Sequence, residues 1–325
     1  MCGAALTGLV ASSLPDTSAT AAGTAASARP DAGEPCPPGM EARLSDPGLP
    51  GLLPEGGELT PDQAAEYEKK LREALEPLRG QDVAPPREVP VVVHVIESED
   101  GEGRVSGERV SDQIETLNTA YGGRFATGPQ STDTGFRFTL SDVTRTADDD
   151  WFSNFNDHRD AIRSHLHQGG PETLNLYTAD LGPGLLGFSS FPQDYAADPE
   201  QDGVVVAHDT LPGGERERFD LGHTATHEVG HWLGLFHTFQ NGCSAPGDYV
   251  SDTPYEREAA TGCPEGRDTC RTRRGLDPVE NFMNYSDDAC MTTFTSGQAE
   301  RMAENWAAFR GGDPRALTRT GAAAE

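Results

Sequence analysis

Three histidines and one glutamate lie within eleven consecutive residues, His227-Glu228-Val229-Gly230-His231-Trp232-Leu233-Gly234-Leu235-Phe236-His237. On a helix, residues four positions apart lie one turn apart on the same face, so His227 and His231 can bind one metal ion. Neutral imidazoles at this spacing are typical ligands of Zn²⁺. Glu228 projects from the edge of that face, where its carboxylate can reach a metal-bound water and not the metal itself.

The third ligand must come from beyond the helix that carries the first two. Gly234 permits the positive φ that ends a helix and turns the chain sharply, so His237 can swing back to the same metal ion. Three histidine ligands leave the fourth position open for water, which is typical of a catalytic zinc site and not of a structural one. Zn²⁺ lowers the pKa of such a water towards about 7, and Glu228 can then accept its proton.

The spacing of the three histidines and the glycine is the signature of metzincin metalloproteases, which also carry a methionine-containing turn downstream. The sequence supplies such a turn at Asn281-Phe282-Met283-Asn284-Tyr285. In metzincins the methionine lies beneath the zinc as an apolar floor, and a tyrosine two residues later can hydrogen-bond the oxyanion. Met283 and Tyr285 match these two positions.

From His94 to Met302 the chain resembles the pappalysin (cytophagalysin) family, peptidase family M43. The stretches that carry the resemblance are Thr226-His227-Glu228-Val229-Gly230-His231-Trp232-Leu233-Gly234-Leu235-Phe236-His237-Thr238-Phe239, Val250-Ser251-Asp252-Thr253-Pro254, Asn281-Phe282-Met283-Asn284-Tyr285-Ser286-Asp287-Asp288 and Phe294-Thr295-Ser296-Gly297-Gln298. The resemblance implies a zinc endopeptidase that acts on proteins or peptides and has the α+β metzincin fold. In that fold a twisted mixed sheet with helices forms the upper subdomain, an irregular disulfide-linked segment forms the lower subdomain, and zinc lies in the cleft between them.

A catalytically inactive metzincin fold, which serves as a metal-binding interaction module, is the alternative from a different functional class. Loss of Glu228 or Tyr285 would favour it, and both residues are present. The cleavage specificity is not predictable at this stage, because the wall of the S1′ pocket depends on the geometry of the loop near residues 291–294.

Four of the six cysteines crowd into 48 residues after the third histidine, at Cys243, Cys263, Cys270 and Cys290. In an exported protein they indicate two disulfides with three possible pairings, and the alternative of a zinc cluster lacks any C-x-x-C hairpin. The family resemblance implies the pairs Cys243–Cys270 and Cys263–Cys290. Each would contribute on the order of 3 kcal/mol by closing a loop of 27 residues.

The charge of the chain is strongly acidic, with 53 Asp and Glu against 25 Lys and Arg and a net charge of −28. This balance disfavours nucleic acid as a partner, because a polyanion would be repelled. It permits calcium, and relatives in the family bind calcium after the third histidine, where Asp248, Asp252 and Thr253 offer oxygen ligands. Solvated loop carboxylates are the alternative. No stretch reaches the roughly 18 apolar residues that a membrane helix needs.

The rest of the chain must supply the elements that position these groups. Thr60-Pro61-Asp62-Gln63 predicts the start of a helix that runs past Leu75 and ends or kinks at Pro77. Hydrophobic periodicity predicts strands at residues 91–96, 136–140, 174–177 and 204–206, and helices at residues 108–121 and 161–166. Residues 182–203 are predicted as a loop and residues 29–55 as irregular. The alternation of strands and helices implies a twisted sheet backed by helices.

The N-terminal part predicts a secreted, extracellular protein made as a zymogen. Residues 1–28 resemble a truncated signal peptide, with a small-x-small cleavage pattern at Ala26-Ser27-Ala28 but no basic n-region, and a disordered tail is the alternative. Residues 29–85 are predicted as a pro-region, residues 86–311 as the catalytic domain and residues 312–325 as a flexible tail. We expect a monomer.

Cys36 is left without a partner once the four downstream cysteines pair and the signal segment is removed. An odd thiol in an exported protein needs an explanation. One hypothesis is a cysteine switch, in which the Cys36 thiolate occupies the open position of the zinc until the pro-region is cut away. The alternative is a pro-region that blocks the cleft sterically or assists folding, with Cys36 a bystander.

Overall fold

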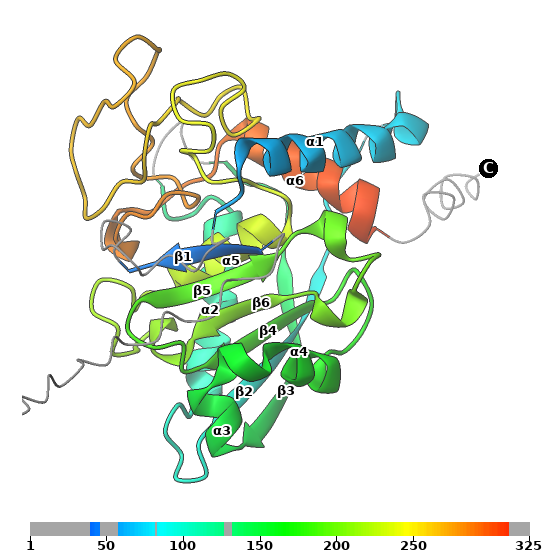
Figure 1. The fold of residues 1–325 in the computed structure, drawn as a ribbon, viewed down its shortest axis with the longest axis vertical. Coiled ribbons are helices and arrows are strands. Elements are labelled where there is room, and N and C mark those ends of the chain that lie inside the picture. The colour runs from blue at the N-terminus through cyan, green and yellow to red at the C-terminus, as the bar shows by residue number, and fades with distance from the viewer. Residues whose placement is uncertain (1–39, 46–57, 82, 127–131, 312–325) are drawn as a thin grey trace, which may run out of the picture. The chain divides into compact units, whose positions relative to one another are not determined.

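The computed structural model describes residues 40–45, 58–81, 83–126 and 132–311 (Figure 1). The strands are β1 (Met40–Leu44), β2 (Val89–Glu97), β3 (Phe138–Ala147), β4 (Leu174–Ala179), β5 (Leu185–Ser190) and β6 (Val204–Ala207). The α-helices are α1 (Pro61–Leu75), α2 (Gly107–Tyr121), α3 (Asp149–Ser153), α4 (Phe155–Leu166), α5 (His223–Trp232) and α6 (Ser296–Asn305). Short helical turns are η1 (Glu76–Leu78), η2 (Pro192–Asp194), η3 (Pro199–Gln201), η4 (His208–Thr210), η5 (Asp288–Cys290) and η6 (Trp306–Arg310). The expected signal peptide, Cys36 and the tail from residue 312 lie outside the described residues.

The strands form one mixed six-stranded sheet in the order β1-β5-β6-β4-β2-β3. Strands β3, β2, β4 and β6 pair in parallel, whereas β5 runs antiparallel to β6. Strand β1 adds to the outer edge of β5, again antiparallel. Figure 1 shows β1 between the sheet and the loops coloured yellow to orange, so a segment from the start of the chain closes this edge.

Helices cover both faces of the sheet, because alternate residues of the strands face opposite sides. On one face, Val91, Val93 and Val95 of β2 join a buried cluster with residues of α2 and α5. On the other face, Ile96 of β2 packs with Phe155 and its neighbours in α3 and α4. The almost continuous β-branched run of β2 is therefore explained by burial on both sides.

Most expected elements are present, and the differences have local causes. Helix α1 begins at the predicted Thr60 capping box and ends at Leu75. Strand β3 begins two residues later than expected and runs on to Ala147. The prediction of a loop over residues 182–203 is wrong for β5, whose Leu-Leu-Gly-Phe-Ser-Ser sequence does not alternate because all six residues are buried. The prediction of irregular structure over residues 29–55 is wrong for β1, which pairs with β5.

Residues 238–295, which we call the lower segment, contain no α-helix and no strand. Its regular structure is the turn η5 and an isolated bridge between Asn281 and Thr293. Polar contacts and disulfides hold this segment, and its sequence shows no periodic hydrophobic pattern.

Candidate metal centre

Helix α5 and the turn that follows it bring three histidines to one point. His227 and His231 lie one turn apart on α5, and Gly234, at a φ of +91°, turns the chain so that His237 returns. The three Nε2 atoms lie 3.1, 3.1 and 3.2 Å from one another, and all three side chains are buried. Gly234 also has no room for a Cβ, which would collide with the side chain of Asn305.

The outer nitrogens of two histidines fix which nitrogen carries the proton. His227 Nδ1 donates to the Phe282 carbonyl at 2.7 Å, and His231 Nδ1 donates to the Leu235 carbonyl at 2.8 Å. Their Nε2 lone pairs therefore remain free and point at one another, which fits a shared cation and not a hydrogen bond. Burial lowers the pKa of all three imidazoles, that of His231 to about 4, so they stay neutral.

Glu228 lies next to the three histidines, and its carboxylate is buried without a hydrogen-bond partner. Burial raises its pKa well above the usual range, while the Arg43 guanidinium and the Arg43 backbone N–H act in the opposite direction. Neither oxygen of Glu228 has a partner with hydrogen-bond geometry. A buried orphan carboxylate beside three converging histidines fits a site that holds a metal ion and a polar reactant.

The Met-turn lies directly under α5. A Cβ at Gly230 would collide with Met283 Sδ, so the glycine allows the methionine to lie against the helix. Two asparagine side chains hold the turn: Asn281 Oδ1 accepts from the Met283 N–H at 2.9 Å, and Asn284 Oδ1 accepts from the Tyr285 N–H at 2.8 Å.

Tyr285 faces the metal-binding group from this turn. Its ring centroid lies 4.9 Å from that of His237 and 5.7 Å from that of His227. Its hydroxyl donates to the Ala42 carbonyl of β1 at 2.6 Å. The structure therefore gives Tyr285 a peptide carbonyl as its partner.

Three residues beside this group were missed by the sequence reasoning: Glu41, Arg43 and Asp288. Glu41 Oε2 lies 3.2 Å from His237 Nδ1. The Arg43 side chain is fully buried, and its Nη2 donates to the Ser286 carbonyl at 2.9 Å and lies 3.5 Å from Asp288 Oδ1. The space that this side chain fills is called the Arg43 pocket below. No sequence signal links Arg43 to Asp288, because 245 residues separate them.

Asp288 forms the acidic end of that pocket. Its Oδ2 accepts from the backbone N–H groups of Leu221 and His223, at the start of α5. Burial raises the pKa of Asp288 to about 6, and Arg43 and the two N–H groups act in the opposite direction. Met291 Sδ lies 3.1 Å from Arg43 Nη2, so Met291 is a further neighbour of the buried guanidinium.

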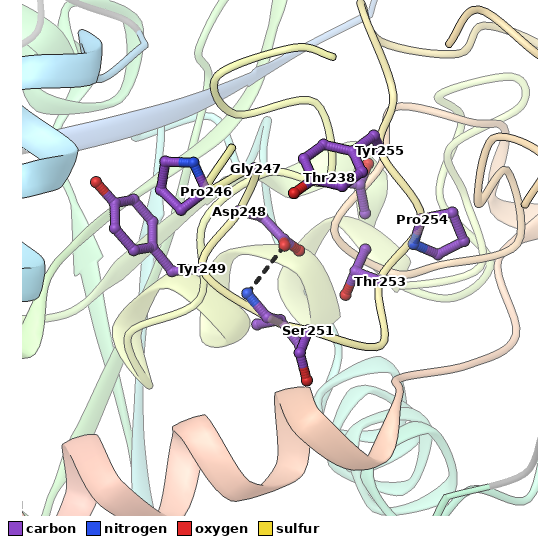
Figure 2. A pocket seen from close by; sticks show the side chains of 10 residues that line it. Thr238, Pro246, Gly247, Asp248, Tyr249, Ser251, Thr253, Pro254 and Tyr255 are labelled. Carbon is purple, nitrogen blue, oxygen red and sulfur yellow. Dashed lines mark hydrogen bonds between the residues drawn. The ribbon is translucent and has the colours of Figure 1, made fainter. Parts of the chain in front are cut away.

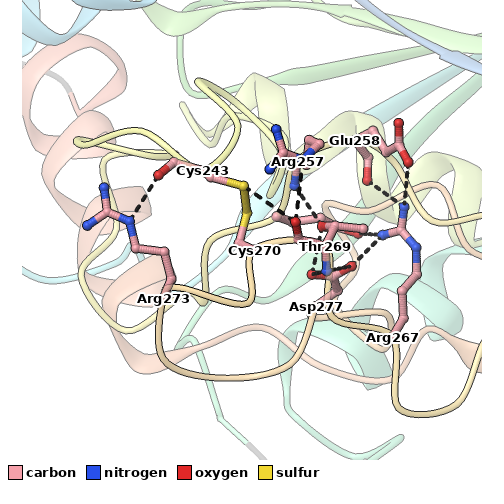
Figure 3. The surroundings of a disulfide bond; sticks show 9 residues. Cys243, Arg257, Glu258, Arg267, Thr269, Cys270, Arg273 and Asp277 are labelled. Carbon is pink, nitrogen blue, oxygen red and sulfur yellow. Dashed lines mark hydrogen bonds and ion pairs between the residues drawn. A yellow bond between two sulfur atoms is a disulfide. The ribbon is translucent and has the colours of Figure 1, made fainter.

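The four clustered cysteines form the pairs Cys243–Cys270 and Cys263–Cys290, the pairing that the family resemblance implied. Figure 3 shows the first pair between two arginines that bind neighbouring parts of the lower segment. Arg273 Nε donates to the Cys243 carbonyl at 3.0 Å, and Arg267 Nη1 pairs with Asp277 at 2.7 Å. The bonds tie together a segment that has no helix or strand of its own.

Of the three oxygen ligands considered for calcium, the structure brings two together. Asp248 and Thr253 line a pocket of about 350 Å³ (Figure 2). Asp248 Oδ1 accepts from the Val250 N–H at 3.1 Å, and its Oδ2 is buried without a partner. Asp252 lies outside this pocket, because its carboxylate accepts from the Thr295 hydroxyl and the Gly297 N–H at the start of α6.

A mixed sheet, two buried histidines on an active-site helix, a third after the helix and a methionine turn beneath it define a metzincin-type zinc metalloprotease. The family model described as "Pregnancy-associated plasma protein-A", Peptidase_M43, matches residues 174–307. The chain belongs to this pappalysin family, M43, and is a zinc metalloendopeptidase.

Similar proteins include two that are named as extracellular metalloproteases. "Extracellular metalloprotease 1" of Coccidioides posadasii is 42% identical over 262 residues, which cover 79% of this chain and 90% of the relative. "Extracellular metalloprotease" of Verticillium alfalfae is 41% identical over 233 residues, which cover 70% and 80%.

Two solved structures from Tannerella forsythia share the fold. A promirolysin mutant, E225A, is 26% identical with a TM-score of 0.65, covering 78% of this chain and 94% of its own. Mature mirolysin in complex with a cleaved peptide is 30% identical with a TM-score of 0.58, covering 68% and 91%. Among the described residues, no helix is long and apolar enough to cross a membrane.

Proposed function

We propose that this chain is an exported endopeptidase in which His227, His231 and His237 hold one zinc ion and Glu228 is the general base. The observation that carries the proposal is the convergence of three neutral Nε2 atoms next to a buried carboxylate with no partner of its own. Bound zinc would act as a Lewis acid that polarises the attacking water and the substrate carbonyl.

The chain's own groups have the following roles. Glu228 accepts a proton from the attacking water and passes it to the leaving nitrogen. Tyr285 donates its hydroxyl to the carbonyl oxygen as negative charge develops there, at the place where it now holds the Ala42 carbonyl. Met283 supplies the apolar floor against Gly230. The alternative of an inactive metal-binding module has no support from these residues, since every group that hydrolysis needs is present.

The pocket beside the site supports a substrate class. A substrate arginine that directly follows the scissile bond would have its side chain where Arg43 lies, between the Ser286 carbonyl and Asp288. A buried carboxylate such as that of Asp288 favours a cationic side chain over a neutral one. We therefore propose that the substrates are polypeptides with arginine directly after the cleaved bond.

Activity should depend on both the metal and Glu228. Glu228→Ala should keep about one zinc per chain while peptidase activity falls to background, because the carboxylate is a base and not a ligand. Chelation by 1,10-phenanthroline should abolish the activity of the unaltered chain, and added zinc should restore it. Substantial turnover by the Glu228→Ala chain would refute the assignment.

The specificity is tested by peptides that differ only in the residue after the cleaved bond. Asp288→Asn should lower kcat/KM for the arginine peptide by about tenfold or more, and should change kcat/KM for a norleucine peptide much less. Equal losses for both peptides would mean that Asp288 supports the fold and does not select the substrate.

A second metal site is proposed at Asp248 and Thr253, for calcium. Asp248 Oδ2 and Thr253 Oγ1 support it, because both oxygens are buried without a hydrogen-bond partner. Asp252 is left out because its carboxylate already accepts from the Thr295 hydroxyl and the Gly297 N–H. Calorimetric titration should show that Asp248→Asn abolishes calcium binding, whereas the matched change Asp252→Asn leaves the affinity within about threefold. Equal calcium affinity in all three chains would remove the proposal.

The remaining proposals concern the setting of the enzyme. Export is supported by the extracellular names of the relatives. The acidic charge supports protein or peptide partners over nucleic acid, and we propose a monomer.

The cysteine switch at Cys36 stays a prediction. A latent Glu228→Ala chain should show one sulfur ligand at about 2.3 Å in its zinc X-ray absorption spectrum, and this ligand should be lost on Cys36→Ala. A shell of nitrogen and oxygen alone would rule the switch out.

A further inference from the structure

Helix α6 supports the turn that carries the chain from α5 to His237. Arg301 of α6 donates from Nε to the Gly234 carbonyl at 2.9 Å. Asn305 lies four positions later on the same face of α6, and its side chain lies so close to Gly234 that a Cβ there would collide with it. Contacts from a second helix therefore hold the turn that brings the third histidine to the other two.

The Gly234 carbonyl belongs to a peptide group that is tied to the metal-binding helix. The same peptide group carries the Leu235 N–H, which donates to the Gly230 carbonyl of α5 at 2.9 Å. The carbonyl of Leu235 accepts from His231 Nδ1 at 2.8 Å. Because a peptide group is planar, a rotation that removed the Gly234 carbonyl from Arg301 would also move the Leu235 N–H away from α5. The Arg301 contact thus fixes the peptide group directly before the carbonyl that orients His231.

The Arg301 guanidinium also contacts the residue that precedes His237. It lies over the Phe236 ring, 4.8 Å from the centroid, which is a cation–π contact. The Phe236 ring packs against Phe191, and the Phe191 ring centroid lies 5.6 Å from that of His231. Arg301 therefore holds the turn twice, through a backbone carbonyl and through an aromatic side chain.

Glu68 of α1 pairs with the other end of this guanidinium. Its Oε2 accepts from Arg301 Nη1 at 2.7 Å, and the side chains of Glu68 and Arg301 are 15% and 6% exposed. In a pair so far removed from water, loss of one partner leaves a costly unpaired charge. The other carboxylate oxygen of Glu68 lies 3.6 Å from Arg72 Nε, and the Arg72 side chain is 69% exposed. Figure 1 shows α1 alongside α6, so the pair joins two helices that are far apart in the sequence.

Helix α1 has further contacts that do not involve Arg301. The Tyr67 ring stacks on Phe191, with ring centroids 5.0 Å apart. The Tyr67 hydroxyl donates to Asp194 Oδ2. These contacts dock α1 on the rest of the chain, so the docking of α1 and the orientation of Arg301 can be changed separately.

We propose that Arg301 is a positioning residue of the metal centre and that Glu68 orients its guanidinium, so that α1, which lies within the predicted pro-region, contributes to zinc affinity from outside the cleft. The proposal rests on the zinc site proposed above and adds the residues that keep its third ligand in place. Without Glu68 the guanidinium is held less firmly, and the Gly234 carbonyl and the Phe236 ring lose a fixed neighbour. His237 then samples more positions, which weakens the binding of a metal ion that needs all three imidazoles at once.

The test measures zinc affinity in the full chain, with Glu228→Ala in every sample so that no chain is digested. The zinc dissociation constant is obtained by competition with a chelating dye, and zinc per chain is counted at saturation. Arg301→Met should weaken zinc binding by about tenfold or more, because loss of a residue that orients a metal ligand typically costs about 10- to 100-fold in affinity. Arg301→Lys, which keeps the charge but not the fork of donors, should weaken it less. An unchanged dissociation constant for Arg301→Met would overturn the proposal.

Glu68→Gln keeps the size of the side chain and removes its charge, so it tests the pair even where Arg301→Met does not fold. It should weaken zinc binding by about threefold or more. The matched control is Arg72→Met, which removes the exposed neighbour of Glu68 and should keep the dissociation constant within about twofold. Equal zinc affinity in the Glu68→Gln and Arg72→Met chains would overturn the role of Glu68.

A coupling measurement distinguishes positioning from a purely structural role. If Glu68 acts through Arg301, Glu68→Gln should have no further effect on zinc affinity in a chain that already carries Arg301→Met. Tyr67→Phe, which removes the hydrogen bond to Asp194, should lower the unfolding free energy and leave the zinc dissociation constant unchanged. Additive losses for Glu68→Gln and Arg301→Met, or equal weakening by Tyr67→Phe, would show that α1 only supports the fold.

The same measurements distinguish this proposal from the zinc site itself. A Glu228→Ala chain that binds no zinc would sink both. One zinc per chain, bound with the same dissociation constant in every Arg301 and Glu68 variant, would sink the positioning role and leave the zinc site intact.

Discussion

The upper region, residues 89–237, and the lower segment, residues 238–295, are held together by different means. The upper region buries apolar clusters on both faces of a sheet. The lower segment relies on two disulfides and on a buried network around Glu256. The active site lies where they meet, with the histidines from one side and Tyr285 from the other. The upper region, which one packed sheet holds together, should therefore lose its structure as a unit. The lower segment, which separate disulfides and polar contacts hold together, should lose its structure part by part.

The largest effect is expected at Asp202, a buried carboxylate of the upper region. It binds Arg310 through two bonds of 2.9 and 3.0 Å and accepts from Trp232 Nε1 at 2.9 Å. Asp202→Ala leaves the buried Arg310 charge unpaired and should cost about 3–5 kcal/mol of unfolding free energy. Denaturant unfolding followed by circular dichroism should remain a single transition at lower stability. If structure were lost in one small part of the upper region only, that region would not unfold as a unit, and the contrast with the lower segment would fail.

Removal of a disulfide should act locally. In the chain with Cys263→Ser and Cys290→Ser, loss of the 27-residue loop closure should cost on the order of 3 kcal/mol. Amide hydrogen exchange should accelerate within residues 238–295 and stay unchanged in β2 and β4. Equal acceleration in both regions would mean that the lower segment folds together with the sheet.

Tyr285 is the residue through which we propose that the lower segment takes part in the chemistry, so its substitution should separate activity from stability. Tyr285→Phe should lower kcat by about 10- to 100-fold and change KM less, because its hydroxyl acts mainly as charge develops. The unfolding free energy should change by about 1 kcal/mol, the value of one hydrogen bond. An unchanged kcat on a peptide substrate would show that Tyr285 only packs.

The smallest effect concerns pH and Glu256, whose Oε2 accepts from the Thr238 hydroxyl and from Asn284 Nδ2 at 2.8 Å each. Burial raises the pKa of Glu256 to about 7, and its hydrogen bonds and Arg267 act in the opposite direction. The folded state thus holds this proton more tightly than the unfolded state. Stability from this group is present below the unfolded pKa, near 4.3, and is lost as the pH rises through about 7.

Exchange rates within the lower segment should therefore rise between pH 5 and pH 8 more in the unaltered chain than in Glu256→Gln. The glutamine keeps an oxygen for Thr238 and Asn284 but cannot ionise, which makes it the matched variant. Parallel pH profiles for the two chains would show that Glu256 stays ionised throughout.

The sequence predicted the upper region well because its signals are periodic. The run at residues 91–96 marked β2, and the four-residue spacing of His227 and His231 marked α5. Strand β5 was missed since both of its faces are buried, so its hydrophobic residues do not alternate. Gly187 within β5 is needed because Val205 O and Glu228 leave no room for a side chain.

The pocket could not be predicted, because its partners are far apart along the chain. Arg43 and Asp288 meet across 245 residues, and β1 carries no pattern of its own that would identify it as a strand. The cysteine pairing came from the family resemblance, since four cysteines allow three pairings and spacing does not choose among them. Polar contacts of this kind depend on the whole fold, and local sequence does not encode them.

Helix α5 has all ten of its residues buried, from His223 to Trp232. It has no solvent-exposed face on which a substitution could be neutral. At Gly230 there is no room for even one added methyl group, because a Cβ would collide with Met283. Directed evolution of this enzyme towards new substrates should therefore accumulate accepted changes in the loops that line the pocket, near residues 219–221 and 286–291. The helix itself should remain almost invariant in such libraries, because any viable change there must also fit a fully packed interior.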